Sequence, residues 1–348
     1  MDLADFDARS GEWLRGQGTD TDVVMSSRVR LARNVAGFPF ALKASEEQKA
    51  EILARMKAAA EELPLGSRRF FVDVASVSSL ESRFLHERRL ISAELDKGKG
   101  PRGVAFGVEE RVSVMVNEED HLRLQAIRSG LAVEAAFDDA VALDRAIEER
   151  ISYSVSPTYG YLTACPTNVG TGLRASVMVH LPALVVARQM EKVFQAAQRT
   201  GFAVRGFHGE GTKATGDFYQ ISNQGTLGVS ESDILQNLSR MLPTILEYER
   251  RVRKHLVESQ TIKLEDKVHR ALAVLRAARS VTTDEAMELL SSVRLGLVVG
   301  LLTEPALPTV NELFLLIQPA HVQKTAGKTL VEEDRDVQRA NELRARLS

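Results

Sequence analysis

The sequence predicts an α+β protein, in which a strand-rich first part is followed by an all-helical C-terminal part. Short runs of alternating apolar and polar residues recur between residues 23 and 222 and indicate strands. From Ser230 onward, apolar residues recur at helical spacing almost without interruption. The 348 residues, 44% of them hydrophobic, suffice for one or two full cores. We therefore expect one domain over residues 1–257 and a smaller helical domain over residues 258–348.

The expected elements follow from local signals. Residues 1–20 are polar apart from Trp13 and are interpreted as a cap over the core. Ser45 begins a capping box, which predicts a helix that ends near Leu63. Strands are expected at residues 23–34, 70–74, 103–108, 112–116, 173–181, 202–207 and 217–222. Helices are expected at residues 80–90, 121–129, 133–151, 184–199, 230–257 with a kink or break at Pro243, 263–279, 283–302, 310–317 and 335–347.

Composition excludes several classes of function. A net charge of -2 argues against a general nucleic-acid or membrane-surface binder, so any cationic site must be local. The single cysteine, Cys165, excludes an internal disulfide and a cysteine-based zinc cluster, and it fits a reducing compartment. We expect no metal site built from side chains, no transmembrane or secretory segment, and a cytoplasmic protein.

Arginines recur at or beside the predicted strand ends. Arg28 and Arg30 alternate with apolar neighbours, so a strand would direct both guanidinium groups to one face. The other three are Arg123, Arg174 and Arg205. If the five converge, they form a cationic cradle suited to the phosphates of a nucleoside triphosphate, with Mg²⁺ arriving on the nucleotide. The alternative for each is a solvated side chain on an exposed strand.

Carboxylates accompany these arginines. Residues 118–120 are three successive acids, and Glu210 lies between glycines in an expected loop. Either the acids are solvated at a helix N-terminus, or they surround a positive ligand. Two carboxylates beside a phosphate site would match the paired donors of a guanidinium, so Glu119 and Glu210 suggest an arginine as the acceptor.

Energetics favour an acceptor held by two carboxylates. A free guanidinium has a pKa of about 13.8, so its deprotonation at pH 7 costs roughly 9 kcal/mol. Deprotonation before attack is therefore unfavourable. The carboxylates would instead orient the nitrogen and take its proton as the bond to phosphorus forms.

Five segments together resemble the guanidino (phosphagen) kinase family, and within it the bacterial branch of protein-arginine kinases. They are SSRVRLAR at residues 26–33, NEEDHLR at 117–123, CPTNVGTGLRASVM at 165–178, RGFHGE at 205–210 and YQISNQGTLG at 219–228. The segments occur in the family's order across most of residues 20–255. The resemblance implies an antiparallel sheet flanked by helices, the guanidino kinase catalytic fold.

The resemblance also assigns roles to residues. Glu119 and Glu210 match the carboxylates that hold and activate the acceptor, Cys165 matches a cysteine beside it, and Arg123, Arg174 and Arg205 match catalytic phosphate-binding arginines. The nucleotide-contacting set would be Ser26, Ser27, Arg28, Val29, Arg30, Arg89, Arg123, Arg174, Ala175, Ser176, Val177, Met178, Arg205, Gly206, Phe207, His208, Gly209 and Glu210. Two residues depart from the family pattern: Arg89 replaces a usual histidine, and Lys213 replaces a usual acid.

A last motif lies near the C-terminus. Residues 335–340, RDVQRA, match a motif of the same branch that implies a phosphoarginine-sensing site at Arg335, Asp336, Arg339 and Ala340. Arg335 and Arg339 are four positions apart, so on a helix they share a face and could bind a phosphoryl group. A solvated helical face is the alternative.

The resemblance implies ATP-dependent phosphorylation of arginine side chains in proteins. The family's small-substrate members carry a helical domain before the first motif, and the early position of Ser26 suggests an open acceptor side instead. The branch further implies a homodimer, a role in stress-response quality control, a Clp-type protease and a zinc-binding activator protein. Two alternatives stay open: a kinase for free arginine or another small guanidine, and a non-catalytic phosphoarginine-binding adaptor.

Overall fold

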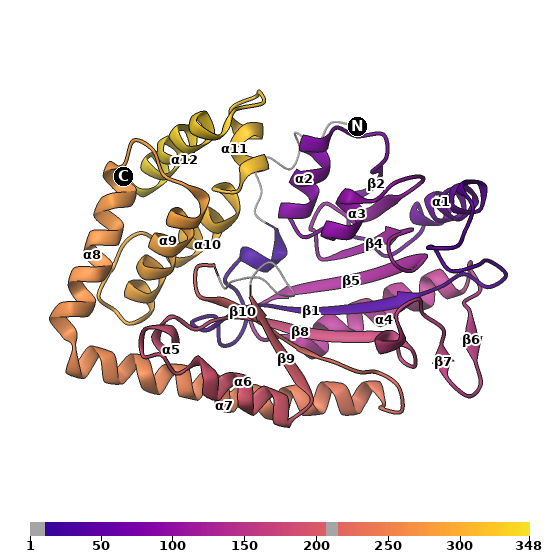
Figure 1. The fold of residues 1–348 in the computed structure, drawn as a ribbon, viewed down its shortest axis with the longest axis horizontal. Helices are drawn as coiled ribbons and strands as arrows, with labels where there is room; N and C mark the ends of the chain where they lie inside the picture. Colours follow the sequence, from indigo (N-terminus) through magenta and orange to yellow (C-terminus); the bar gives the residue numbers. More distant parts are fainter. Residues whose placement is uncertain (1–10, 207–214) are drawn as a thin grey trace.

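The computed structural model describes residues 11–206 and 215–348 (Figure 1). Within these residues, an antiparallel sheet of eight strands forms the centre of the molecule. A small hairpin of β6 (Val155–Ser156) and β7 (Gly160–Tyr161) lies beside it. The eight strands, in spatial order, are β2 (Arg69–Asp73), β3 (Gly103–Gly107), β4 (Val112–Val116), β5 (Leu122–Ser129), β1 (Val24–Arg33), β8 (Leu173–His180), β10 (Phe218–Asn223) and β9 (Phe202–Gly206).

Helices cover one face of this sheet. The helix α4 packs on β1, β5 and β8, and α7 packs on β8 and β10. Buried apolar residues such as Val29, Ala175 and Val177 point toward these helices. The helices before residue 260 are α1 (Glu46–Ala60), α2 (Ser79–Glu87), α3 (Ala93–Lys97), α4 (Val133–Glu148), α5 (Pro182–Val186), α6 (Met190–Arg199) and α7 (Glu231–Ser259), with short 3-10 turns η2 (Glu12–Leu14) and η3 (Pro166–Asn168).

Five further helices form the C-terminal part, coloured orange to yellow in Figure 1. They are α8 (Thr261–Ala277), α9 (Thr283–Val298), α10 (Leu307–Leu316), α11 (Pro319–Thr325) and α12 (Glu332–Leu347). One hydrophobic core runs from the sheet through α7 into these helices, and a second lies between β2–β4 and α2–α3. The division expected at residues 257 and 258 falls in the last turn of α7, and it stays a prediction.

The helix expected over residues 121–129 is wrong, because these residues form strand β5. Leu, Arg, Gln and Ala favour helices in isolation, but β5 pairs with β4 on one side and with β1 on the other. Leu122, Leu124 and Ala126 are fully buried on one face of the sheet. Tertiary pairing therefore overrides local propensity.

Two other helices also differ from expectation. The helix expected over residues 184–199 is two helices, α5 and α6, which are separated at Arg188, where φ is 54°. Pro243 was expected to kink or break its helix, yet α7 continues from Glu231 to Ser259. Both differences are local, and the helices still cover the same face of the sheet.

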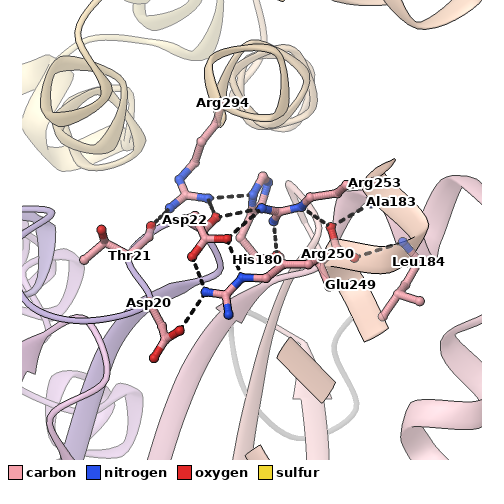
Figure 2. Close-up of polar contacts among 10 residues, drawn as sticks. All are labelled: Asp20, Thr21, Asp22, His180, Ala183, Leu184, Glu249, Arg250, Arg253 and Arg294. Carbon is pink, nitrogen blue, oxygen red and sulfur yellow. Dashed lines mark hydrogen bonds and ion pairs between the residues drawn. The ribbon is translucent and has the colours of Figure 1, made fainter. Parts of the chain in front are cut away.

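A buried charge network connects the C-terminal helices to the sheet (Figure 2). Arg294 on α9 is fully buried and donates to the carbonyl oxygens of Thr21 and Asp22, at 2.7 and 3.1 Å. It also donates to Nδ1 of His180 at 2.8 Å, so this nitrogen is the acceptor and the Nε2–H bonds Ser291 Oγ at 2.9 Å. Burial, together with the neighbouring arginines, lowers the pKa of His180 well below its ordinary value. His180 is therefore a neutral link between the two parts.

Candidate active site

The five arginines expected to converge do lie around one cavity, of about 1310 Å³. The cavity lies between the open face of the sheet and the C-terminal helices, which contribute Phe314 and Pro319 to its wall. Among the described residues, nine arginine and lysine side chains line it against four glutamates, an excess of five positive charges in a chain whose net charge is -2. This local excess of positive charge is what the binding of a polyanion requires.

Strand register brings these arginines together. Arg30 on β1 lies directly opposite Arg174 on β8, and Arg28 is two residues from Arg30 on the same face. Arg123 on β5 is opposite Ala32, and Arg205 on β9 is opposite Gln220 on β10. The alternation expected for β1 and β8 is thus present, with arginines toward the cavity and apolar residues toward the helices.

Neutral groups orient several of the guanidiniums. Arg28 Nη2 donates to Gln220 Oε1 at 2.8 Å, and Arg174 Nη2 donates to Ser222 Oγ at 3.2 Å. Nε of Arg30 is buried and has no hydrogen-bond partner in the part of the chain that the structure describes. The neutral acceptor on Arg28 fixes this guanidinium without cancelling its charge, so Arg28 keeps its affinity for an anion.

The crowding of like charges is visible in the pKa values. Burial, with added repulsion from Arg89, Arg174 and Arg123, lowers the pKa of Arg28 to about 9. Burial and neighbouring arginines also hold the pKa of Arg30 well below its ordinary value, and burial lowers the pKa of Arg89 to about 10. An anion bound among these groups would raise all three pKa values again.

A prediction for pH follows. Because the pKa of Arg28 is about 9 in the free protein and higher beside bound phosphates, the ATP complex holds more protons than the free protein above pH 9. ATP affinity should therefore be constant from pH 7.5 to 8.5 and fall by up to about tenfold per pH unit above pH 9. Calorimetry at pH 9 in two buffers of different ionisation enthalpy should detect proton uptake, and Arg28→Gln should reduce it. An unchanged affinity at pH 10 would contradict this assignment.

The three successive acids have three different environments. Glu118 has a fully buried side chain, which pairs with Arg123 and accepts from Ser92. Asp120 is also buried and accepts from Asn34 and from the backbone N–H of Ala164, so it fixes the acidic turn to the segment before Cys165. Only Glu119 is partly open, with 37% of its side chain exposed. Glu119 is therefore the acid available to a ligand.

Glu119 has the properties of a guanidinium-binding base. Its Oε2 lies 3.1 Å from Arg123 Nη2, so its position already accommodates one guanidinium. Burial raises the pKa of this carboxyl, the nearby carboxylates of Asp120 and Glu118 raise it further, and Arg123 opposes the shift. A raised pKa makes a carboxylate a better proton acceptor near neutral pH.

Cys165 lies at the wall of the same cavity, immediately before η3. Its Sγ lies 3.0 Å from Thr167 Oγ1, and Thr163 Oγ1 donates to its carbonyl oxygen at 2.8 Å. The side chain is half-buried. Glu119 and Cys165 thus border the same space as the arginines.

Some expected nucleotide-contacting residues direct their side chains elsewhere. Val29, Ala175 and Val177 are buried on the helix-covered face, and Ser27 Oγ donates to the carbonyl oxygen of Gly130 at 2.9 Å. Ser26, Ser176 and Met178 are buried on the other side, and Gly206 ends β9. A nucleotide contact of the first four would have to use the backbone. Phe207, His208, Gly209, Glu210 and Lys213 lie outside the described residues.

Arg89 faces the cavity from the turn after α2, where its φ is 64°. Its guanidinium carbon lies 5.1 Å from the centre of a Trp13 ring. Trp13 itself is buried in the core and lines the cavity, and the cap expected over residues 1–20 stays a prediction, since residues 1–10 lie outside the described residues. The pair offers an aromatic and cationic surface at this end of the cavity.

The C-terminal motif lies on α12, and its residues do not themselves line the cavity. Arg339 is only 1% exposed, and it donates to the carbonyl oxygens of Ile317 and Val281 and to Asp336. Arg335 donates to the carbonyl oxygen of Leu330 at 3.0 Å, and Ala340 is buried. Arg339 therefore connects α12 to the end of α10, and phosphoarginine sensing by this motif stays a prediction.

Sequence reasoning missed several neutral residues of the cavity. Gln125 and Gln220 line it, and Ser222 binds Arg174. Gln220 and Ser222 are two apart on β10, so the alternation of that strand was a usable signal. Gln125 was missed because residues 121–129 were expected to form a helix, and only in the strand β5 does Gln125 point to the same side as Arg123.

Comparisons with known proteins agree with this geometry. Residues 51–252 match the ATP:guanido phosphotransferase C-terminal catalytic domain, and residues 261–348 match the protein-arginine kinase McsB C-terminal domain. Among solved structures, a lombricine kinase aligns with a TM-score of 0.60 at 26% identity, over 68% of each chain. A duplicated taurocyamine kinase from Schistosoma mansoni aligns with a TM-score of 0.60 at 24% identity, over 73% of this chain and 36% of that one, and supports the fold alone.

Curated relatives extend over nearly the full length. A protein-arginine kinase of Symbiobacterium thermophilum is 43% identical over 97% of this chain and 96% of the relative. That of Halothermothrix orenii is 41% identical over the same shares. Within the described residues, no helix is long and apolar enough to cross a membrane, and no three His, Cys, Asp or Glu side chains are grouped to hold a metal ion. The two domain matches and these full-length relatives show that the chain belongs to the protein-arginine kinase branch of the ATP:guanido phosphotransferases.

Proposed function

We propose that this protein transfers the γ-phosphoryl group of ATP to the guanidinium of arginine side chains in proteins. The observation that carries the proposal is the single cavity in which an excess of arginines faces Glu119 and Cys165. The arginines suit a polyphosphate, and a partly open carboxylate suits a guanidinium. A cavity of about 1310 Å³ has room for both substrates at once.

The reaction would be an in-line displacement. Arg28, Arg30 and Arg174 would bind the phosphates, with Arg123 and Arg205 at either side, and stabilise the charge of the moving phosphoryl group. Glu119 would hold the acceptor guanidinium and take its proton as a nitrogen attacks the γ-phosphorus. The bond from that phosphorus to the bridging oxygen breaks, and ADP leaves. Glu210 is proposed as the second carboxylate from the sequence motif alone.

Mg²⁺ would enter as the nucleotide complex. The arginines that dominate the cavity cannot ligate a cation, so the nucleotide phosphates would be its main ligands. Bound there, it would neutralise phosphate charge. The other positive charges on the moving phosphoryl group would come from the arginines of this chain.

A substrate comparison tests the proposal. The protein is incubated with ATP and either an unfolded arginine-containing protein or free arginine, and phosphoarginine is detected by mass spectrometry at neutral pH, since the N–P bond is acid-labile. We expect phosphate on protein arginines. Phosphate only on the free amino acid would favour a metabolite kinase, and none on either would favour a phosphoarginine-binding adaptor.

The proposal also covers the oligomeric state, the localisation and the partners of this protein. By its family, this protein would act as a cytoplasmic homodimer in stress-response quality control, with a Clp-type protease downstream and a zinc-binding protein as activator. The relatives' names support the kinase activity, and the wider context rests on the sequence resemblance.

A further inference from the structure

A second pocket lies next to the main cavity, beside the segment that follows Cys165. Its volume is about 340 Å³, and Thr167 lines both this pocket and the main cavity. The loop after β10 is shared in the same way, since Gln224 lines the main cavity while Gly225 lines the second pocket. Two chain segments, the one with Thr167 and the one with Gln224 and Gly225, therefore lie between the two spaces and form the wall that separates them.

Hydrogen bonds hold this wall in place. The hydroxyl of Thr226 is buried and lies 3.0 and 2.7 Å from the carbonyl oxygens of Thr167 and Val169. Asn223 donates to the carbonyl oxygen of Leu173 and accepts from the N–H of Ala175, which fixes the loop to β8. The relative position of cavity and pocket is thus set by hydrogen bonds on both sides.

The second pocket differs from the cavity in its chemistry. None of the described residues that line it carries a charge. Its lining includes the buried side chains of Phe202 and Ile234, while Leu227 and Val229 are 56% and 39% exposed. An apolar side chain would gain by entering, whereas a charged one would lose its hydration without a partner.

We propose that this pocket binds an apolar side chain of the protein substrate, close in sequence to the arginine being phosphorylated. The inference rests on the proposed function, because the neighbours of an arginine held at Glu119 and Cys165 would lie near the segment around Thr167 that borders both spaces. In an extended chain successive residues are about 3.3 Å apart, so a residue one to three positions from the arginine could reach the pocket. A substrate with an exposed apolar residue beside arginine is typical of an unfolded protein.

The test uses peptides with one arginine in a serine–glycine background. A single leucine is moved through the three positions on each side of the arginine, and kcat/KM is measured relative to the all-serine peptide. With the full-length protein, we expect leucine to raise kcat/KM about tenfold at one or two positions, equivalent to about 1.4 kcal/mol. Equal values at every position would overturn the proposal.

Variants locate the effect. Leu227→Asp puts a charge at the rim, and Gly225→Leu fills the pocket at a position where an added Cβ would meet no atom within 4 Å. Both variants should reduce the ratio of kcat/KM for the preferred leucine peptide to kcat/KM for the all-serine peptide to about one. Because partial misfolding lowers both rates equally, the ratio reports the pocket alone. Ile262→Asp on α8 is the matched control, since this residue is 83% exposed and does not line the pocket, and it should keep the full ratio.

The outcomes separate this inference from the proposed function. If the unaltered protein phosphorylates no peptide and no protein, the proposed function fails. If it phosphorylates all peptides but Leu227→Asp and Gly225→Leu keep the leucine preference, only the pocket assignment fails. A variant that changes the oligomeric mass in light scattering without changing the ratio would show that a second copy of the chain occupies the pocket, and would also overturn the assignment.

Discussion

Glu119→Gln should lower kcat for arginine phosphorylation by about 10²- to 10⁴-fold, the range expected when a positioned general base is lost. The substitution keeps the size and hydrogen-bonding shape of the side chain but removes the proton acceptor. Glu119 is the only one of the three successive acids with a substantially open side chain, at 37%. The loss should therefore be in kcat, measured by single-turnover formation of phosphoarginine, and ATP affinity should change little.

The matched control is Glu148→Gln, an exposed acid on α4 on the opposite side of the sheet. It should keep full activity. Glu118→Gln separates catalysis from structure, since this buried residue pairs with Arg123 and its loss should lower stability as well as rate. If Glu119→Gln keeps kcat within about threefold of the unaltered protein, Glu119 is not the base.

Arg294→Leu should destabilise the protein by about 3–5 kcal/mol, as expected when several buried hydrogen-bond acceptors lose their donor at once. The fully buried guanidinium donates to the carbonyl oxygens of Thr21 and Asp22 and to His180 (Figure 2). Leucine satisfies none of these acceptors, and each buried acceptor left alone is costly. Urea unfolding followed by circular dichroism measures the change.

The control for this variant is Arg270→Leu on α8, whose side chain is 78% exposed and faces Asp266 at 4.0 Å. A surface pair of this kind contributes little, so the midpoint should shift only slightly. If Arg294→Leu unfolds at the same urea concentration as the unaltered protein, the network does not hold the C-terminal helices to the sheet.

Much of the fold was predictable because its signals are local. Alternation located β1, β4 and β8, and the capping box at Ser45 located α1. The strand β5 was not predictable in this way, because its residues favour a helix and only pairing with β1 and β4 makes them a strand. Arg123 was thus identified by motif, while its position on the sheet came from the structure.

The sequence by itself determined the family, through its motifs, and it predicted which residues would carry the chemistry: arginines on alternating strands, an acidic turn and one cysteine. Residue type and spacing are written in the chain, so these features could be recognised without coordinates. Only the tertiary structure decided which of three neighbouring acids is open to a ligand, that Gln220 and Ser222 orient the arginines, and that a second, uncharged pocket adjoins the first. The reason is physical: burial, register and enclosed space arise from contacts between residues distant in sequence, and these exist only after the chain has folded.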